Sequence, residues 1–140
     1  MISPTTMKTI LALVVLAHGI GHALGILAGL GVKLSSSHSL ESWLFDGLLG
    51  KTFSQYFGFL LSALAIIAFF ATSLSLLGWF LPPDLWESLG ITASLISLLL
   101  VVFYWNFLPF LFPNKVGVIV IDGWLLFSIL WWHWPTALFR

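Results

Sequence analysis

Residues 7–30 read MKTILALVVLAHGIGHALGILAGL, an apolar segment with two histidines near its middle. A membrane-spanning helix needs about 20 mainly apolar residues, and this segment meets that length. His18 and His22 are four residues apart, so in a helix they share one face and lie one turn from each other. Ionisable groups at this depth in a membrane are costly and usually face the protein interior with a partner. The segment therefore predicts a first membrane helix that carries a polar site on one face.

Glycines continue the same face of this helix. Gly21, Gly25 and Gly29 recur every fourth residue beside the histidines. Small residues at this spacing allow another backbone, or a flat ligand, to come close. The polar interruption is unusual for the apolar core of a signal peptide, so we expect the helix to be retained.

The composition is typical of a membrane protein. Of the 140 residues, 60% are hydrophobic and 7% are charged, whereas a soluble domain carries about a quarter charged residues. Most of the five basic and five acidic residues lie between the apolar runs, and they form no basic face for nucleic acid. The absence of cysteine excludes disulfides and thiolate metal sites.

Three further apolar segments follow, at residues 56–81, 90–112 and 116–134. The last two are separated only by the short turn at 113–115, and short turns make neighbouring helices antiparallel. We therefore predict an all-α membrane protein with four transmembrane helices in an antiparallel bundle, forming a single domain over residues 1–140.

The first connection, residues 32–53, contains four of the ten charged residues. It is interpreted either as an ordered loop or as a loop with a short helix lying at the membrane interface. In the second span, small residues recur on one face, which predicts tight packing against a neighbour. These residues are Gly58, Ser62, Ala65, Ala68, Thr72 and Ser75.

A carboxylate in the fourth span is predicted to meet the histidines. From the helical rise, His22 lies roughly 6 Å from the centre of the first span and Asp122 about 4–5 Å from the centre of the fourth, displaced towards the same side. Tyr104 and Asn106 of the third span are expected at this level, about 200° apart around the helix, so at most one of them points at the site. A lone carboxylate in hydrocarbon is expensive, and a histidine at the same depth can pair with it. The candidate site comprises His18, His22 and Asp122, supported by Tyr104, Asn106, Gly21 and Gly25.

Three functions remain open for this site. The first is a structural role in an accessory subunit of a larger membrane complex, where polar side chains hold helices together. The second is a ligand site, in which His18 and His22 bind a tetrapyrrole of the haem or chlorophyll type, or bind a transition metal together with Asp122. We favour a combination of these two. The alternative is a proton-coupled small transporter or a membrane enzyme using His22 and Asp122.

We expect a non-enzymatic protein, because an enzyme needs more converging polar groups than the sequence offers. The expected partners are membrane lipid and either other membrane subunits or further copies of the chain, with no nucleic acid.

The pattern His18-Gly19 followed by His22, with Asp122 in the last span, resembles small bacterial four-helix integral membrane proteins that begin with a His-Gly-x-x-His-like pair. The resemblance covers the whole chain. It implies the four-helix fold and a location in the bacterial plasma membrane, and it carries no assigned activity.

Overall fold

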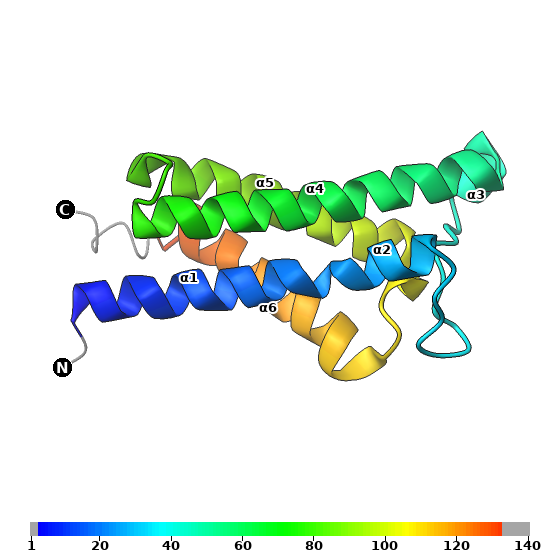
Figure 1. Ribbon diagram of the computed structural model, residues 1–140, viewed down its shortest axis with the longest axis horizontal. Coiled ribbons are helices and arrows are strands. Elements are labelled where there is room, and N and C mark those ends of the chain that lie inside the picture. Colours follow the sequence, from blue (N-terminus) through cyan, green and yellow to red (C-terminus); the bar gives the residue numbers. More distant parts are fainter. Residues whose placement is uncertain (1–2, 133–140) are drawn as a thin grey trace.

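The computed structural model describes residues 3–132, whose regular structure is entirely helical, with no β-strand in this part of the chain. Four helical segments of the described chain are long and apolar enough to cross a membrane. They lie side by side along the long axis of the molecule (Figure 1). The predicted all-helical class and number of candidate spans are therefore confirmed. The four segments are Pro4–Gly29, Lys51–Leu77, Pro83–Phe103 and Leu111–Leu130.

The first segment consists of α1 (Pro4–Gly21) and α2 (Ala23–Gly29), which meet at His22. The Ser3 hydroxyl caps α1 by accepting a hydrogen bond from a backbone N–H of the first turn. The N–H of His22 donates to the carbonyl of Gly19 over 3.1 Å, a tightened turn of the 3₁₀ type. The two helices continue in one direction, so they form one span with a local irregularity at the second histidine (Figure 1).

A short helix, α3 (Phe45–Leu49), lies in the first connection. The Ser42 hydroxyl accepts a hydrogen bond from the Phe45 N–H, and the Asp46 carboxylate accepts one from the Ser42 N–H. This reciprocal arrangement satisfies backbone donors at the start of a helix. Of the two interpretations of residues 32–53, the one that includes a short helix matches the described chain.

The second span is α4 (Lys51–Leu77), which begins directly after Gly50 and ends at Gly78. Gly78 has φ +67°, the left-handed conformation with which glycine commonly ends a helix. The helix thus begins before the expected residue 56 and ends before residue 81, because the glycines rather than the following prolines set its limits.

Helix α4 is the central element, and it packs against α1, α2, α3 and the next long helix. The predicted small-residue face is almost entirely buried, with Ala68 half-buried and the adjacent Phe69 fully buried. The buried members of that face are Gly58, Ser62, Ala65, Thr72 and Ser75.

The third span is the 3₁₀ turn η1 (Pro83–Leu85) followed by α5 (Trp86–Phe103). It ends nine residues before the expected residue 112. Leu108 and Phe112 both have extended backbone, and each precedes a proline, which disfavours the helical conformation in the residue before it.

The fourth span comprises η3 (Leu111–Lys115) and α6 (Val116–Leu130). Between α5 and η3 lies the short turn η2 (Trp105–Phe107). The connection between the last two long helices therefore occupies the residues from Tyr104 onward, and is longer than the expected turn at 113–115. Residues 133 and 134 of the predicted span lie outside the described residues.

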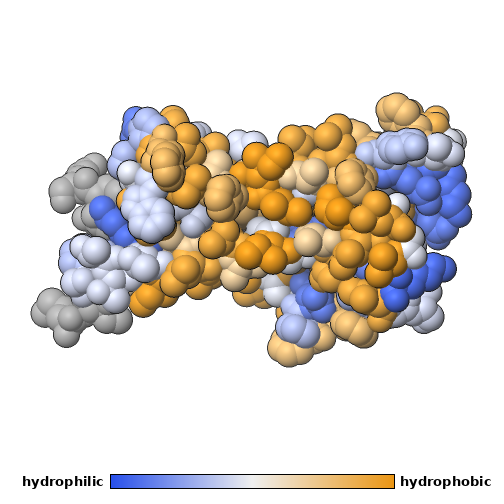
Figure 2. All heavy atoms as spheres, viewed as in Figure 1, coloured by the Kyte–Doolittle hydropathy of each residue, from blue (hydrophilic) through white to orange (hydrophobic). Residues whose placement is uncertain are grey.

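The surface carries many exposed large apolar side chains, including Leu13, Ile67, Val102 and Val120. In Figure 2 the apolar residues cover the middle of the molecule, and hydrophilic residues are concentrated towards its ends. This distribution is consistent with insertion of the four helices into a membrane.

Candidate functional site

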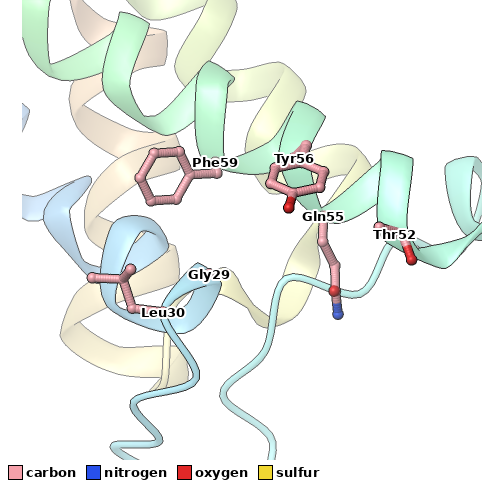
Figure 3. A pocket seen from close by; sticks show the side chains of 6 residues that line it. All are labelled: Gly29, Leu30, Thr52, Gln55, Tyr56 and Phe59. Carbon is pink, nitrogen blue, oxygen red and sulfur yellow. The ribbon is translucent and has the colours of Figure 1, made fainter.

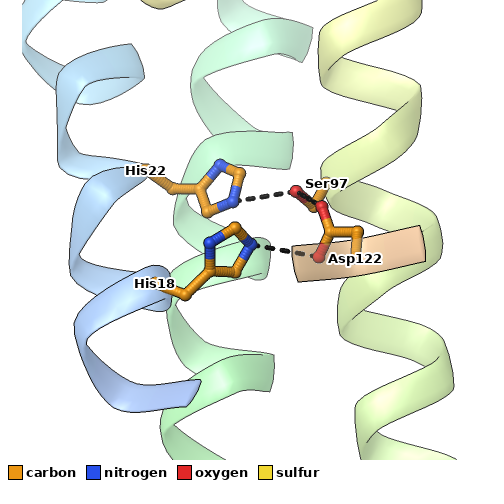
Figure 4. Close-up of polar contacts among 4 residues, drawn as sticks. All are labelled: His18, His22, Ser97 and Asp122. Carbon is orange, nitrogen blue, oxygen red and sulfur yellow. Dashed lines mark hydrogen bonds and ion pairs between the residues drawn. The ribbon is translucent and has the colours of Figure 1, made fainter. Parts of the chain in front are cut away.

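Four polar side chains, from α1, the junction of α1 and α2, α5 and α6, form one hydrogen-bonded network (Figure 4). His18 Nε2 lies 3.0 Å from Asp122 Oδ1. Ser97 Oγ lies 2.9 Å from His22 Nε2 and also donates to Asp122 Oδ2. His22 at the junction of α1 and α2 therefore reaches the carboxylate through a serine of α5. We call His18, Asp122, Ser97 and His22 the polar network.

The direction of the bonds follows from the number of protons available. The Ser97 hydroxyl has one proton, which it donates to Asp122, so its oxygen accepts the Nε2–H of His22. This assigns the His22 proton to Nε2 and leaves Nδ1 as a bare lone pair. Nδ1 is enclosed and has no hydrogen-bond partner among the described residues. The opposite direction would place an unpaired N–H there, which is the costlier arrangement.

The polar network is almost completely shielded from solvent. His22, Ser97 and Asp122 have no exposed surface, whereas His18 retains 8%. A carboxylate in such surroundings is stabilised only by its partners, here one imidazole and one hydroxyl. His18 is therefore the member through which the polar network meets the outside of the protein.

The imidazole of His22 lies between two phenyl rings. Its centroid is 5.7 Å from that of Phe69 and 5.7 Å from that of Phe107, and the planes are within 10° and 8° of parallel. Phe69 also meets the ring of His18 edge-on, at 4.7 Å between centroids. These aromatic contacts fix the orientation of both imidazoles.

His38 in the first connection holds one of these phenyl residues in place. Its Nδ1 accepts the Leu34 N–H, so its Nε2–H points at the carbonyls of Leu24 and Phe107, each 3.1 Å away. The ring is 1% exposed. His38 thus joins the end of the first span to the backbone of the residue that stacks on His22.

The structure brings together the three central residues predicted from the sequence, with one change of partner. His18, rather than His22, contacts the carboxylate of Asp122 directly. The pairing follows from Ser97, which takes up the second oxygen of Asp122 and the Nε2 of His22.

The two predicted supporting residues of the third span lie elsewhere. The Tyr104 hydroxyl donates to the Ser54 carbonyl over 2.8 Å, and burial raises the pKa of this phenol above its ordinary value. Asn106 is half-buried, and its backbone carbonyl accepts a bond from the Ser39 N–H. Neither contributes a hydrogen bond to the polar network.

The sequence analysis missed Ser97, and the cause is the position of the third span. With the span placed at 90–112, the level of the histidines falls near Tyr104. Because α5 instead occupies Trp86–Phe103, that level falls in its middle, where Ser94 and Ser97 are buried. Small hydroxyl residues within an apolar helix are the signal that identifies this face.

The predicted glycine positions divide into packed and open sites. A methyl group added at Gly25 would lie 2.2 Å from Ser62 Oγ and 3.3 Å from the Phe107 ring. At Gly21 it would meet no neighbouring heavy atom within 4 Å. The space beside Gly25 that was expected to accept another backbone or a flat ligand is therefore filled by side chains of this chain.

No group of three or more His, Cys, Asp or Glu side chains in the described chain is arranged to hold a metal ion. The three predicted ligands lie close together, but Nε2 of each histidine is directed at an oxygen of the polar network. In the described arrangement these side chains hydrogen-bond to one another.

The surface of the described chain is hollowed in at least two places. The larger, about 330 Å³, is formed by the end of α2 and the start of α4 and includes Gln55 and Tyr56 (Figure 3). It shares no lining residue with the polar network. The smaller, about 180 Å³, lies between α1 and the start of α6, and His18 forms part of its wall.

Comparison of the chain with models of protein families, with curated proteins and with solved structures finds no match.

Proposed function

We propose that the chain is a small bacterial integral membrane protein that crosses the plasma membrane four times as an antiparallel bundle and exchanges a proton at the His18–Asp122 pair. In this proposal it belongs with the small bacterial four-helix membrane proteins that its histidine pair resembles. The observation that carries the proposal is the enclosed polar network with a single outlet at His18.

The pair has two electrically neutral states. In one, His18 is an imidazolium and Asp122 a carboxylate; in the other, His18 is neutral and Asp122 is protonated. Each state contains one proton more than the anionic form of the pair, in which His18 is neutral and Asp122 is ionised. A net charge in these apolar surroundings is costly. The pair is therefore suited to hold one proton, which moves between an imidazole nitrogen and a carboxylate oxygen 3.0 Å apart.

Ser97 and His22 extend the path along which this proton can be transferred. A hydroxyl that accepts from an imidazole N–H and donates to a carboxylate can reverse both bonds and pass a proton along the row. The stacked rings of Phe69 and Phe107 hold His22 in line for this transfer. We assign the polar network the role of a proton relay.

The relay works within a larger membrane assembly in this proposal. The four helices expose large apolar side chains on their outer faces, which suit lipid or the helices of another subunit. Purification in mild detergent followed by mass spectrometry of co-purifying proteins tests this part. A single monodisperse chain with no companion in stoichiometric amount contradicts it.

Infrared spectroscopy tests the proton site directly. The purified protein is titrated with acid and base in lipid vesicles, and the carboxylic-acid C=O band is followed. We expect a band that appears on acidification in the native chain and is absent in Asp122→Asn. Glu87→Gln is the matched control, because this half-buried carboxylate lies in the first turn of α5, outside the polar network. A titration identical in the native chain and Asp122→Asn overturns the proposal.

A bound haem, chlorophyll-type pigment or transition metal at His18 and His22 is the second candidate. The observation in its favour is that Nδ1 of both rings makes no hydrogen bond within the described chain. Such a ligand requires Phe69 or Phe107 to move away from His22. An absorption spectrum and metal analysis of the purified protein test it, and a colourless sample without stoichiometric metal rejects it.

A further inference from the structure

The hollow of about 180 Å³ between α1 and the start of α6 lies beside the polar network. His18 and Asn114 are its polar lining residues, and the remainder of its wall is apolar or glycine. Among the apolar residues, Pro113 is exposed, so the hollow opens on the outer surface of the helices. Any molecule that enters it from the membrane therefore meets a mostly apolar wall with one imidazole and one carboxamide.

Two glycines create this space. Gly21 on α1 and Gly117 on α6 both line it, and a methyl group added at either would meet no neighbouring heavy atom within 4 Å. The two helices are not closely packed on each other, since α6 makes its main long-helix contact with α5 and α1 makes its own with α4. The hollow is thus a gap that the protein's own side chains leave open.

One nitrogen of His18 is available to a molecule in this hollow. Nε2 is engaged by Asp122. Nδ1 makes no hydrogen bond in the described chain, and unlike Nδ1 of His22 it is not among the fully enclosed unpaired atoms. The side chain is 4% exposed, while that of Asp122 is fully buried. The ring edge of His18 that includes Nδ1 is therefore the part of the polar network that can contact a molecule in the hollow.

We propose that the hollow binds the ring of a lipid-soluble quinone or quinol, with a ring oxygen hydrogen-bonded to His18 Nδ1. An apolar cavity of about 150 Å³ holds a benzene molecule, so about 180 Å³ accommodates one substituted six-membered ring. A tail attached to the ring leaves through the open side into lipid.

The quinone class fits because His18 has two protonation forms. When the pair has lost its proton, His18 is neutral with Nε2–H directed at the Asp122 carboxylate, and its bare Nδ1 accepts a bond from a quinol hydroxyl. In both neutral states of the pair His18 has a proton on Nδ1, which donates to a quinone carbonyl. A ligand that exists in a carbonyl form and a hydroxyl form can thus hydrogen-bond to His18 Nδ1 whether or not the His18–Asp122 pair holds its proton. The preference of quinol for one protonation state of the His18–Asp122 pair and of quinone for the other rests on the proposed proton exchange. The binding of the ring itself rests on the hollow.

The test uses the full chain in detergent and a ubiquinone analogue with a short saturated tail. Gly117→Leu fills the hollow and leaves the four side chains of the polar network unchanged. Gly123→Leu is the matched control, because Gly123 lies on the same helix, is exposed, has no neighbour within 4 Å of an added methyl group and does not line the hollow. Both changes raise helix propensity, so neither is expected to prevent folding.

We expect saturable quenching of tryptophan fluorescence by the analogue in the native chain and in Gly123→Leu. In Gly117→Leu the dissociation constant of the analogue should rise at least about tenfold. A decane control without the ring should give no saturation. In protein labelled with ¹⁵N-histidine, the analogue should shift the Nδ1 resonance of His18. Equal binding by the two leucine variants, or an unshifted Nδ1 resonance at saturation, overturns the proposal.

The infrared titration of Asp122 separates this result from the proposed function. An Asp122 band that titrates in a protein without saturable quinone binding leaves proton exchange standing and rejects the quinone site. Saturable binding that Gly117→Leu removes, in a protein whose Asp122 band does not titrate, keeps the quinone site and rejects proton exchange.

Discussion

The imidazole of His18 and the carboxylate of Asp122 connect α1 to α6, with Nε2 3.0 Å from Oδ1 across 104 positions of sequence. The two helices have little other packing in the described chain. The contact therefore links the first and last spans through a polar bond rather than through an apolar interface. Its removal should affect both the assembly of the helices and the proton site.

Asp122→Leu should destabilise the protein more than Asp122→Asn. Leucine leaves the His18 N–H and the Ser97 hydroxyl without their acceptor, whereas asparagine retains one carbonyl oxygen. A buried donor without a partner costs about 1–3 kcal/mol, so we expect a difference of that order in the free energy of unfolding. Chemical unfolding in detergent, followed by circular dichroism, measures it. Equal stabilities for the two variants would show that the bonds to Asp122 contribute little.

Ser97→Ala should cost stability, because it removes the acceptor of the His22 N–H and leaves that donor buried. We expect a loss of about 1–3 kcal/mol in the same unfolding measurement. Ser94→Ala is the matched control on the same helix. Ser94 is equally buried, but its hydroxyl has no hydrogen-bond partner among residues 3–132, so its removal should be neutral or stabilising. The reverse order of the two serine variants would show that the hydrogen bonds of Ser97 contribute little to stability.

Gly25→Ala and Gly21→Ala should have opposite effects on thermal stability. The added methyl group at Gly25 overlaps the Ser62 hydroxyl and crowds Phe107, so Ser62 must give up its bond to the Gly58 carbonyl or the helices must separate. At Gly21 it enters open space, and alanine favours the helix over glycine by up to about 1 kcal/mol. We expect a lower melting temperature for the first variant and an unchanged or higher one for the second. A similar loss in both variants would mean that Gly21 is also a packed position.

Tyr104 should make the protein sensitive to alkali. Burial raises the pKa of its phenol in the folded state, so ionisation favours the unfolded chain. This contribution is complete below the ordinary tyrosine pKa of about 10 and is lost as the pH rises above it. Tyr104→Phe should reduce the alkaline loss of stability, while Tyr56→Phe, which alters an exposed phenol, should not. A steeper alkaline loss in Tyr104→Phe would contradict this assignment.

The sequence was sufficient for the helical class and the central residues of the site because both depend on short-range patterns. Apolar length predicts the four candidate spans, and the spacing of His18 and His22 places them on one helix face. Asp122 was predicted to meet the histidines because both lie near the middle of long apolar runs, where depth follows from helical rise.

The remaining details depended on contacts that local patterns do not encode. α5 ends where the backbone of Tyr104 leaves the helical conformation, and the extended residues before Pro109 and Pro113 keep the chain from resuming this helix, although the apolar run continues across them. That shift moved Tyr104 out of the expected site and Ser97 into it. The role of His38 was also hidden, because a histidine in a polar connection gives no sign that its partners are the carbonyls of Leu24 and Phe107.

The most direct test of the shared proton is ¹⁵N NMR of the histidine-labelled protein in lipid, recorded across a pH series. His38→Gln and His133→Gln assign the other two of the four histidine rings. We predict that at neutral pH His22 has its proton on Nε2 and a bare Nδ1, and that the His18 resonances change with pH in parallel with the Asp122 carboxyl band. A proton on Nδ1 of His22, or His18 resonances that respond to pH identically in the native chain and Asp122→Asn, would contradict it.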